Sequence, residues 1–339
     1  METGENQFSK ILVIQTAFIG DAILATALLE SIHASVPKAQ IDILVRKGNE
    51  GLFSWHPFIN KVLIWEKKKN KYRNLFRVLK NISQTRYDKV INVQRFAATG
   101  ILTAFSKAKQ TIGFDKNPFS FLFSDIIRHE ISEKDSMLHE IERNHELIRS
   151  FTDGKAAKPK LYPSQADDIA VAKWEQKPYI CVAPASVWFT KQFPLDQWVD
   201  FLDYLPEKIT VMIIGAPGDY EVCELIRKRS RHNLSINLAG QLNFLESASL
   251  MKEAVMNYVN DSAPMHFASA VNAPVTAVYC STIPAFGFGP LSDISHIVEV
   301  TEPLSCRPCG LHGKKACPLD HFNCAKLIRN EQLLDVLPA

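Results

Sequence analysis

The stretch KILVIQTAFIGDAILATALL, residues 10–29, decides the fold of the N-terminal half. Ile11 to Ile14 form an apolar run that fits one buried strand, and a loop of small residues leads to Gly20 and Asp21, which open an apolar helix. This order is typical of an open parallel sheet, in which the loops after the strands lie at the edge where ligands bind. Asp21 is therefore expected to present a carboxylate to a crevice, and we predict that it is a catalytic base.

The composition is that of an ordinary globular protein. The chain has 339 residues, 46% hydrophobic and 22% charged, which leaves room for two domains. No apolar run reaches the roughly 18 to 20 residues of a membrane span, and the first ten residues lack a signal-peptide core. We therefore expect a cytoplasmic location. A net charge of +3 is too small to indicate a nucleic-acid partner.

Alternation of strands and helices continues after the first helix, which should end near Val36. A segment rich in lysine, proline and small residues, 152–163, indicates a linker. In the N-terminal half the pattern predicts strands at 41–45, 62–65, 90–93 and 111–114, a basic helix at about 71–84, a loop with three phenylalanines at 117–123 and a helix at 137–151.

The second half repeats this rhythm and predicts a second parallel sheet, because such spacing requires crossover connections. The expected fold is α/β, with two Rossmann-like domains that face each other across a cleft: 1–155, a linker region at 156–175, and 176–339. A last apolar helix at 324–337 closes the second domain or crosses back to the first. The predicted strands are 179–183, 209–214, 235–238, 256–259 and 275–279, with helices that begin near Leu195, Asp219, Leu245 and Pro264.

Two loops of the second half carry groups suited to a diphosphate. In APASVWFTKQFP, residues 183–194, a buried strand is followed by Ser186, Thr190 and Lys191. The alternative is that Lys191 is an ordinary solvated lysine. The turn IIGAPGD, with Gly215 and Asp219, lacks the full dinucleotide fingerprint. Its glycines therefore either contact a nucleotide or only permit a tight turn.

The segment NDSAPMH, residues 260–266, predicts a helix N-terminus at the ligand edge. Asp261 and Ser262 suit a helix cap, and a proline early in the helix fits its first turn. Free N–H groups and the positive end of the helix dipole would then favour an anionic leaving group. The alternatives are that Asp261 is only a cap and that His266 is a packed histidine.

The seven cysteines fit reduced thiols better than a disulfide framework. Four of them are spaced C-x2-C-x7-C-x6-C near the C-terminus. Four thiolates would suit a structural zinc or iron ion, and free or partly oxidised thiols are the alternative. The four are Cys306, Cys309, Cys317 and Cys324.

Taken together, four blocks resemble glycosyltransferase family 9, the ADP-heptose:lipopolysaccharide heptosyltransferases. They are IGDAILATALL at 19–29, APASVWFTKQFP at 183–194, the IIGAPGD turn with LAGQLNFLE at 238–246, and VNDSAPMHFASAVNAPVTAVYCST at 259–282. The resemblance implies the GT-B fold, with an N-terminal acceptor domain and a C-terminal sugar-nucleotide domain. The chain departs from the family pattern at 281–284, where Ser-Thr-Ile-Pro replaces the common Thr-Asp-Pro, so a different donor sugar is an alternative.

The resemblance also implies roles for individual residues. Asp21 would take the proton of the attacking acceptor hydroxyl, and ADP would leave from the opposite face without an obligatory metal ion. The implied donor-binding residues are Ser186, Thr190, Lys191, Gly215, Asp219, Gly240, Asp261, Ser262 and His266, and the acceptor-side candidates are Gly20, Arg95, Arg143 and Asn144.

The partners that the resemblance implies are an ADP-activated sugar and an anionic glycolipid, the inner core of lipopolysaccharide. The basic stretch 61–80 would suit contact with the cytoplasmic face of the inner membrane, although such a stretch is more often a solvated helix face. A nucleotide-dependent oxidoreductase is a more remote alternative, because the complete glycine fingerprint and its ribose-binding acid are missing. A two-domain binding protein of the periplasmic type would need a signal peptide.

Overall fold

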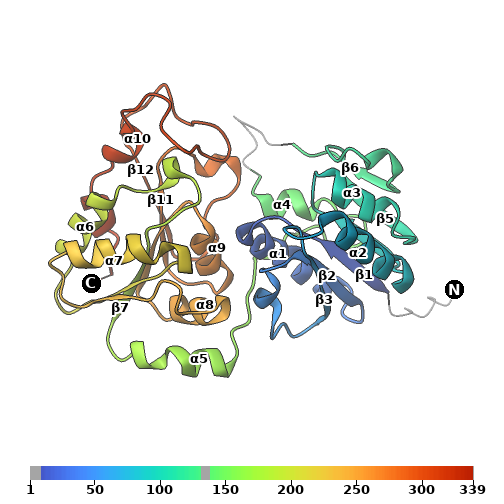
Figure 1. The fold of residues 1–339 in the computed structure, drawn as a ribbon, viewed down its shortest axis with the longest axis horizontal. Coiled ribbons are helices and arrows are strands. Elements are labelled where there is room, and N and C mark those ends of the chain that lie inside the picture. The colour runs from blue at the N-terminus through green and yellow to red at the C-terminus, as the bar shows by residue number, and fades with distance from the viewer. Residues whose placement is uncertain (1–8, 131–137, 339) are drawn as a thin grey trace. The chain divides into compact units, whose positions relative to one another are not determined.

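The computed structural model describes residues 9–130 and 138–338, which form two compact units. Within these residues, unit 1 comprises 9–130 and 138–162, and unit 2 comprises 163–338. Each unit contains one six-stranded sheet in which every neighbouring pair is parallel. Helices lie on both faces of each sheet (Figure 1). No helix in the described part of the chain could cross a membrane.

Unit 1 has the strand order β3-β2-β1-β4-β5-β6. Helix α1 packs against α4, and α2 packs against α3. The elements are β1 (Lys10–Ile14), α1 (Ile19–Ser35), β2 (Gln40–Arg46), β3 (Ile59–Trp65), α2 (Lys71–Thr85), β4 (Lys89–Asn92), α3 (Ala97–Ala104), β5 (Gln110–Phe114), β6 (Asp125–Ile127) and α4 (Glu140–His145).

Unit 2 has the order β12-β11-β10-β7-β8-β9, the same topology as unit 1. Its elements are α5 (Gln165–Val171), β7 (Tyr179–Ala183), α6 (Leu195–Asp203), β8 (Thr210–Ile213), α7 (Tyr220–Arg229), β9 (Ser235–Asn237), α8 (Phe244–Lys252), β10 (Met256–Asn260), α9 (Ala263–Ala270), β11 (Val275–Tyr279), β12 (Ser295–Glu299), α10 (Asn323–Lys326) and α11 (Glu331–Leu334).

The first helix, α1, is apolar on every side, and each residue from Ala22 to Leu29 is buried. One face covers the sheet, and α4 and the chain at 155–162 cover the rest. The amide of Lys160 donates to the Thr26 hydroxyl at 2.8 Å, and the Tyr162 hydroxyl donates to Glu30 at 2.8 Å. The segment expected to be a linker is thus fixed to α1 at its start, and it contains α5 further along.

The predicted helix at 137–151 is wrong in extent. Met137 lies outside the described residues, and α4 ends at His145. Leu147 and Ile148 are fully buried, as their spacing suggested, but their amides bond to carbonyls only three residues back. The apolar pattern therefore reported burial in tight turns rather than a continuing α-helix.

The predicted helix at 324–337 is two short helices, α10 and α11. The Gln197 side chain donates to the carbonyls of Lys326 and Ile328, at 3.2 and 2.8 Å, which a continuous helix would use internally. Cys324, Ala325, Ile328 and Leu333 belong to the core of unit 2. The C-terminal segment thus contributes to the core of unit 2.

Four helices and strands of the described residues were not predicted: α3, β6, α5 and β12. The sequence of α3, AATGILTA, contains a glycine and two threonines, which are poor helix formers. Gly100 is required there because a Cβ atom would lie 2.1 Å from Oδ1 of Asn117. Local propensity is overridden by packing at this position.

Candidate functional site

The strand order of each sheet indicates where a ligand is expected to bind. In unit 2, β7 and β10 are neighbours at the centre of the sheet. The strands that follow β7 lie on one side of this pair, and the strands that follow β10 lie on the other. In open α/β sheets, ligands bind beyond the carboxyl ends of the two strands where the order reverses. The loop at 184–194 follows β7, and Asp261 and Ser262 follow β10. The predicted donor-binding residues of these two loops therefore lie at the switch point of unit 2.

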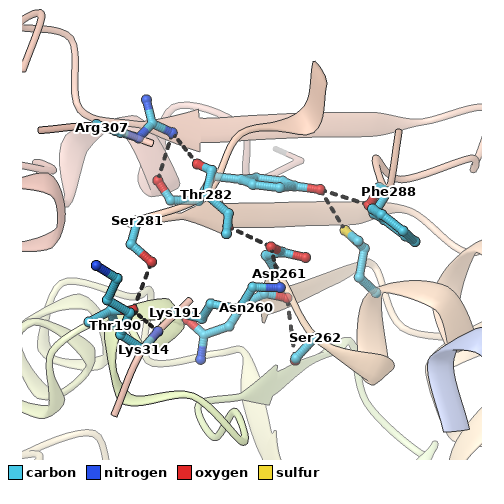
Figure 2. A network of polar contacts seen from close by, with 12 residues as sticks. Thr190, Lys191, Asn260, Asp261, Ser262, Ser281, Thr282, Phe288, Arg307 and Lys314 are labelled. Atoms are coloured by element: carbon cyan, nitrogen blue, oxygen red, sulfur yellow. Dashed lines mark hydrogen bonds and ion pairs between the residues drawn. The ribbon is translucent and has the colours of Figure 1, made fainter. Parts of the chain in front are cut away.

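An ion pair joins these two loops (Figure 2). Nζ of Lys191 lies 2.7 Å from Oδ2 of Asp261, and the two side chains are 16% and 7% exposed. The hydroxyl of Thr282, beyond the end of β11, donates to the same carboxylate oxygen at 2.6 Å. Because Asp261 is occupied by these two donors, its carboxylate orients the lysine and does not act as a simple helix cap.

Asn260, the last residue of β10, fixes the shape of the loop that carries Lys191. Its amide nitrogen donates to the carbonyl of Pro184 at 2.7 Å, and its amide oxygen accepts from the backbone of Phe193 at 2.9 Å. Both ends of the loop are thereby bound to one side chain that has no exposed surface. Such a loop holds its groups in a fixed geometry before a ligand arrives.

Helix α9 begins directly after this ion pair. Ser262 is its N-cap residue in extended conformation, and Pro264 lies at the start of the helix, where no N–H is needed. The first N–H groups and the positive end of the dipole face the edge at which β10 ends. Together with Lys191, this arrangement can bind a phosphate or diphosphate anion.

In unit 1, Asp21 lies in the first turn of α1, just beyond the end of β1, and is partly exposed. The N-cap residue of α1 is Phe18, which has no polar side-chain atom with which to cap the helix. β1 and β4 form the switch point of this sheet, and Arg95 follows β4 with an exposed side chain. Asp21 thus lies at the ligand edge, as the sequence predicted.

An ion pair on α4 lies within electrostatic reach of Asp21. Oε2 of Glu140 accepts from Nε and Nη2 of Arg143, at 2.9 Å in both cases, and the side chains are only 14% and 5% exposed. Burial raises the pKa of Glu140, the Arg143 cation opposes that shift, and the Asp21 carboxylate adds to it. Burial and the cations of Arg95 and Arg143 lower the pKa of His129 to about 4. The carboxylate of Asp21 is therefore close enough to α4 to influence Glu140.

Comparison with known proteins agrees with this geometry. The sequence profile described as "Glycosyltransferase family 9 (heptosyltransferase)" matches residues 75–319. The chain belongs to glycosyltransferase family 9. It is 24% identical over 318 residues to "Lipooligosaccharide heptosyltransferase 2" of Haemophilus ducreyi, covering 86% of this chain and 89% of the relative.

Solved structures of the family share the fold. The structure of "E. coli ADP-heptose lps heptosyltransferase II" has a TM-score of 0.76 at 20% identity, with 97% of this chain and 98% of that chain covered. The "iron-containing dodecameric glycosyltransferase TibC" of enterotoxigenic E. coli has a TM-score of 0.60 at 15% identity, with 97% and 75% covered. The family 9 chain is thus a glycosyltransferase with the two-domain α/β architecture of the GT-B fold, as predicted.

Several predicted donor-binding residues of this glycosyltransferase are already engaged within unit 2. The Thr190 hydroxyl, 1% exposed, accepts from Ser281 at 2.9 Å and from the backbone of Lys314 at 2.8 Å. Asp219 accepts from the amide of Ala216 at 2.8 Å, which closes its own turn. The remaining predicted residues lie in loops or first turns at the ends of β7, β8, β9 and β10: Ser186, Gly215, Gly240, Ser262 and His266.

The two glycines of the IIGAPGD and LAGQ motifs serve close packing. Gly240 has a φ of +76°, and a Cβ atom there would lie 2.8 Å from the backbone of Pro217. Its amide donates to the carbonyl of Gly215 at 2.9 Å. On the acceptor side, Asn144 is only 1% exposed. Arg95 is the exposed acceptor-side candidate.

The structure shows no metal site at the four clustered cysteines, all of which lie in the described residues. Within residues 9–130 and 138–338, no group of three or more His, Cys, Asp or Glu side chains could hold a metal ion. The thiol of Cys309 donates to the carbonyl of Cys306 at 3.3 Å. Burial, with smaller contributions from the neighbouring Cys309 and Cys317, raises the pKa of Cys324 to about 11.

Sequence reasoning missed Asn260, Thr282, Arg307 and Glu140. Asn260 and Thr282 stand beside predicted residues, and the signal was present in the NDSAP and CST motifs. Glu140 lies three residues before Arg143, a spacing that favours an ion pair on a helix. Arg307 had no such signal, because its role depends on contacts with β11 that only the fold creates.

Proposed function

We propose that this glycosyltransferase moves a heptose from ADP-heptose to the inner core of lipopolysaccharide, with inversion at the anomeric carbon. The observation that carries the proposal is the fixed Lys191–Asp261 pair beside the N-terminus of α9, because it provides positive charge for a diphosphate at the switch point of unit 2. The similar E. coli structure is named for the same donor and supports this choice.

In the proposed reaction, Asp21 accepts the proton of an acceptor hydroxyl. The hydroxyl oxygen forms a bond to the anomeric carbon, and the bond from that carbon to the β-phosphate oxygen breaks. The electron pair leaves with ADP, whose growing negative charge is stabilised by Lys191 and by the N–H groups of α9. Unit 1 would be the acceptor-binding domain and unit 2 the sugar-nucleotide domain, and the leaving group needs no metal ion.

The acceptor is proposed to be an anionic glycolipid at the cytoplasmic face of the inner membrane. Helix α2 supports this, because its sequence KYRNLFRVLKNISQT contains no acidic residue and two of its aromatic side chains point into solvent. Tyr72 and Phe76 are 69% and 63% exposed and lie one turn apart on the same face. Exposed cations flank them: Lys71, Arg73, Arg77 and Lys80. Such a helix suits a membrane interface that carries anionic lipid.

A donor screen by calorimetry tests the proposal. The purified chain is titrated with ADP-, UDP- and GDP-sugars, and ADP-heptose should bind more tightly than the others. Equal or tighter binding of another nucleotide sugar would favour the alternative, transfer of a different sugar to another surface glycan. The oxidoreductase alternative is excluded by family membership.

The cysteine segment is proposed to have a structural role that takes no part in the transfer. The fold is shared with an iron-containing relative, so metal analysis of protein purified without chelators is the direct test. A stoichiometric zinc or iron ion would assign Cys306, Cys309, Cys317 and Cys324 as its ligands. Protein without such an ion that transfers at the full rate would assign them as thiols.

A further inference from the structure

Residues 304–317, here called the strap, contact the loop that carries Lys191 and the loop at 280–282, whose Thr282 binds Asp261. The strap includes three of the four clustered cysteines and lies far from these loops in sequence. Figure 2 shows Arg307 of the strap above the end of β11, with Lys314 beside Thr190.

The first contact is the guanidinium of Arg307, whose side chain is 11% exposed. It donates to the carbonyl of Cys280 at 2.8 Å and to those of Tyr279 and Thr282 at 3.2 and 2.8 Å. It also pairs with Glu299 of β12 at 2.6 Å. One planar group thereby binds three backbone carbonyls between residues 279 and 282, where β11 ends, a task for which a fork of N–H donors is suited.

From Arg307 a continuous series of contacts leads to the donor loop. The residue whose carbonyl Arg307 fixes, Thr282, donates its hydroxyl to Asp261 at 2.6 Å, and Asp261 pairs with Lys191 at 2.7 Å. Thr282 and Asp261 are 1% and 5% exposed. Movement of the loop at 280–282 would therefore move the carboxylate that orients the lysine.

The second contact is a pair of hydrogen bonds between Lys314 and Thr190. The amide of Lys314 donates to the Thr190 hydroxyl at 2.8 Å, and the amide of Thr190 donates to the carbonyl of Lys314 at 3.1 Å. The approach is close, because a Cβ atom on Gly313, whose φ is +75°, would lie 3.0 Å from Cγ of Lys191. Ser281 bonds to Thr190 and accepts from the amide of Cys309 at 2.9 Å, which joins the two contacts.

We propose that the strap positions the diphosphate-binding groups, and that Arg307 is a positioning residue which acts through Thr282 and Asp261 on Lys191. This inference rests on the proposed function, since it takes the Lys191–Asp261 pair as the place where the donor diphosphate binds. It gives the cysteine-containing segment a definite task, namely control of donor affinity by backbone contacts. Arg307 itself lies behind the loop and does not touch the donor.

The test measures the affinity for ADP by calorimetry in Arg307→Ala and Arg307→Lys. Arg307→Ala should weaken ADP binding by about 10-fold, the equivalent of one lost charge-assisted hydrogen bond. Arg307→Lys should recover part of this loss, because one ammonium group can satisfy some of the carbonyls but lacks the planar fork. The matched control is Arg231→Ala, which removes an exposed arginine of unit 2 that pairs with Asp203.

A double-mutant cycle with Lys191→Met separates positioning from a general loss of structure. If Arg307 acts through the lysine, Arg307→Ala should have no further effect on ADP affinity once Lys191 is absent. If it acts through a general loss of structure, the losses of affinity in the two single variants should add in the double variant. Wild-type ADP affinity in a folded Arg307→Ala variant, or full additivity, would overturn the proposal. Unchanged affinity in Lys191→Met alone would instead overturn the proposed donor site.

Thr190→Val provides a second variant in case Arg307→Ala does not fold. It removes the hydroxyl that accepts hydrogen bonds from Ser281 and Lys314 but keeps the branched shape of the side chain. The inference expects weaker ADP binding in this variant as well, with Thr190→Ser retaining more of the affinity than valine. Wild-type ADP affinity in Thr190→Val would overturn the role of the second contact.

Discussion

The ammonium group of Lys191 lies 2.7 Å from the carboxylate of Asp261, and both side chains are almost enclosed. Two opposite charges in such a setting stabilise the fold only while both are present, because removal of one leaves the other desolvated and unpaired. When the donor diphosphate binds, the same lysine must serve a second anion. The pair therefore links the stability of the free protein to its affinity for ADP.

The first prediction concerns the removal of one or both of these charges. Lys191→Met should weaken ADP binding by roughly 100-fold or more, because it removes the cation and leaves a carboxylate beside the phosphates. Asp261→Asn should destabilise the free protein by about 2 kcal/mol, since the lysine loses its partner. Combined, the two changes should recover most of the stability but none of the affinity. Thermal unfolding and calorimetry measure the two properties separately, and recovery of affinity in the double variant would contradict the assignment.

The second prediction concerns Asp21 as the base. Asp21→Asn should leave folding and ADP affinity unchanged and lower turnover by roughly 100-fold or more, the usual contribution of a positioned base. The reason is that asparagine has nearly the same shape but cannot accept the hydroxyl proton. Turnover is measured at saturating donor, with ADP titration as the control. Near-normal turnover would eliminate this role.

How far the sequence predicted the site depends on the range of the contacts involved. Asp21, Lys191 and Asp261 each follow a buried strand, and parallel topology brings strand ends to one edge, so local patterns sufficed. The roles of Thr282 and Arg307 come from hydrogen bonds across the sheet, which no local pattern records. For the same reason the predicted helices at 137–151 and 324–337 were too long, because apolar spacing indicates burial and not the backbone path.

The third prediction concerns the Glu140–Arg143 pair on α4. Glu140→Gln removes a negative charge that acts on Asp21 and leaves the Arg143 cation in excess. An added net positive charge favours ionised Asp21, so the acidic limb of the pH–turnover profile should shift to lower pH, by roughly half to one unit. Arg143→Gln should shift it in the opposite direction. If both variants had the same pH–turnover profile as the wild type, the pair on α4 would not influence the base.

The fourth prediction concerns membrane contact through α2. Tyr72→Ser with Phe76→Ser should weaken flotation with vesicles that contain phosphatidylglycerol, because two exposed aromatic anchors are lost. Lys68→Glu with Lys69→Glu should also weaken flotation, and added salt should weaken the flotation of the wild type, because both reduce the attraction to anionic lipid. The matched control is Tyr204→Ser in unit 2, since Tyr204 is as exposed as Tyr72. Equal flotation of all variants would remove α2 as the docking surface.

The fifth prediction concerns acid stability and His56 in unit 1. Its side chain is 1% exposed, packs edge-on against Phe58 and Tyr162, and has Nε2 3.9 Å from Glu30. Burial, with smaller contributions from His33 and Lys160, lowers the pKa of His56 to about 4, and burial also raises the pKa of Glu30. His56 is therefore neutral at pH 7, and its contact with Glu30 is not an ion pair there.

Because the folded pKa of His56 is lowered, the unfolded chain takes up the proton first, from about pH 6.5 downward. The contribution to stability is complete above pH 6.5 and is lost as the pH falls toward 4, by up to about 3 kcal/mol. His56→Phe keeps an aromatic ring without a titrating nitrogen, so its melting temperature should fall less between pH 7 and pH 5 than that of the wild type. His296→Asn in β12 serves as the control and should follow the wild type. An acid-induced decrease of the same size in His56→Phe would show that other groups, such as Glu30, determine the acid stability of this unit.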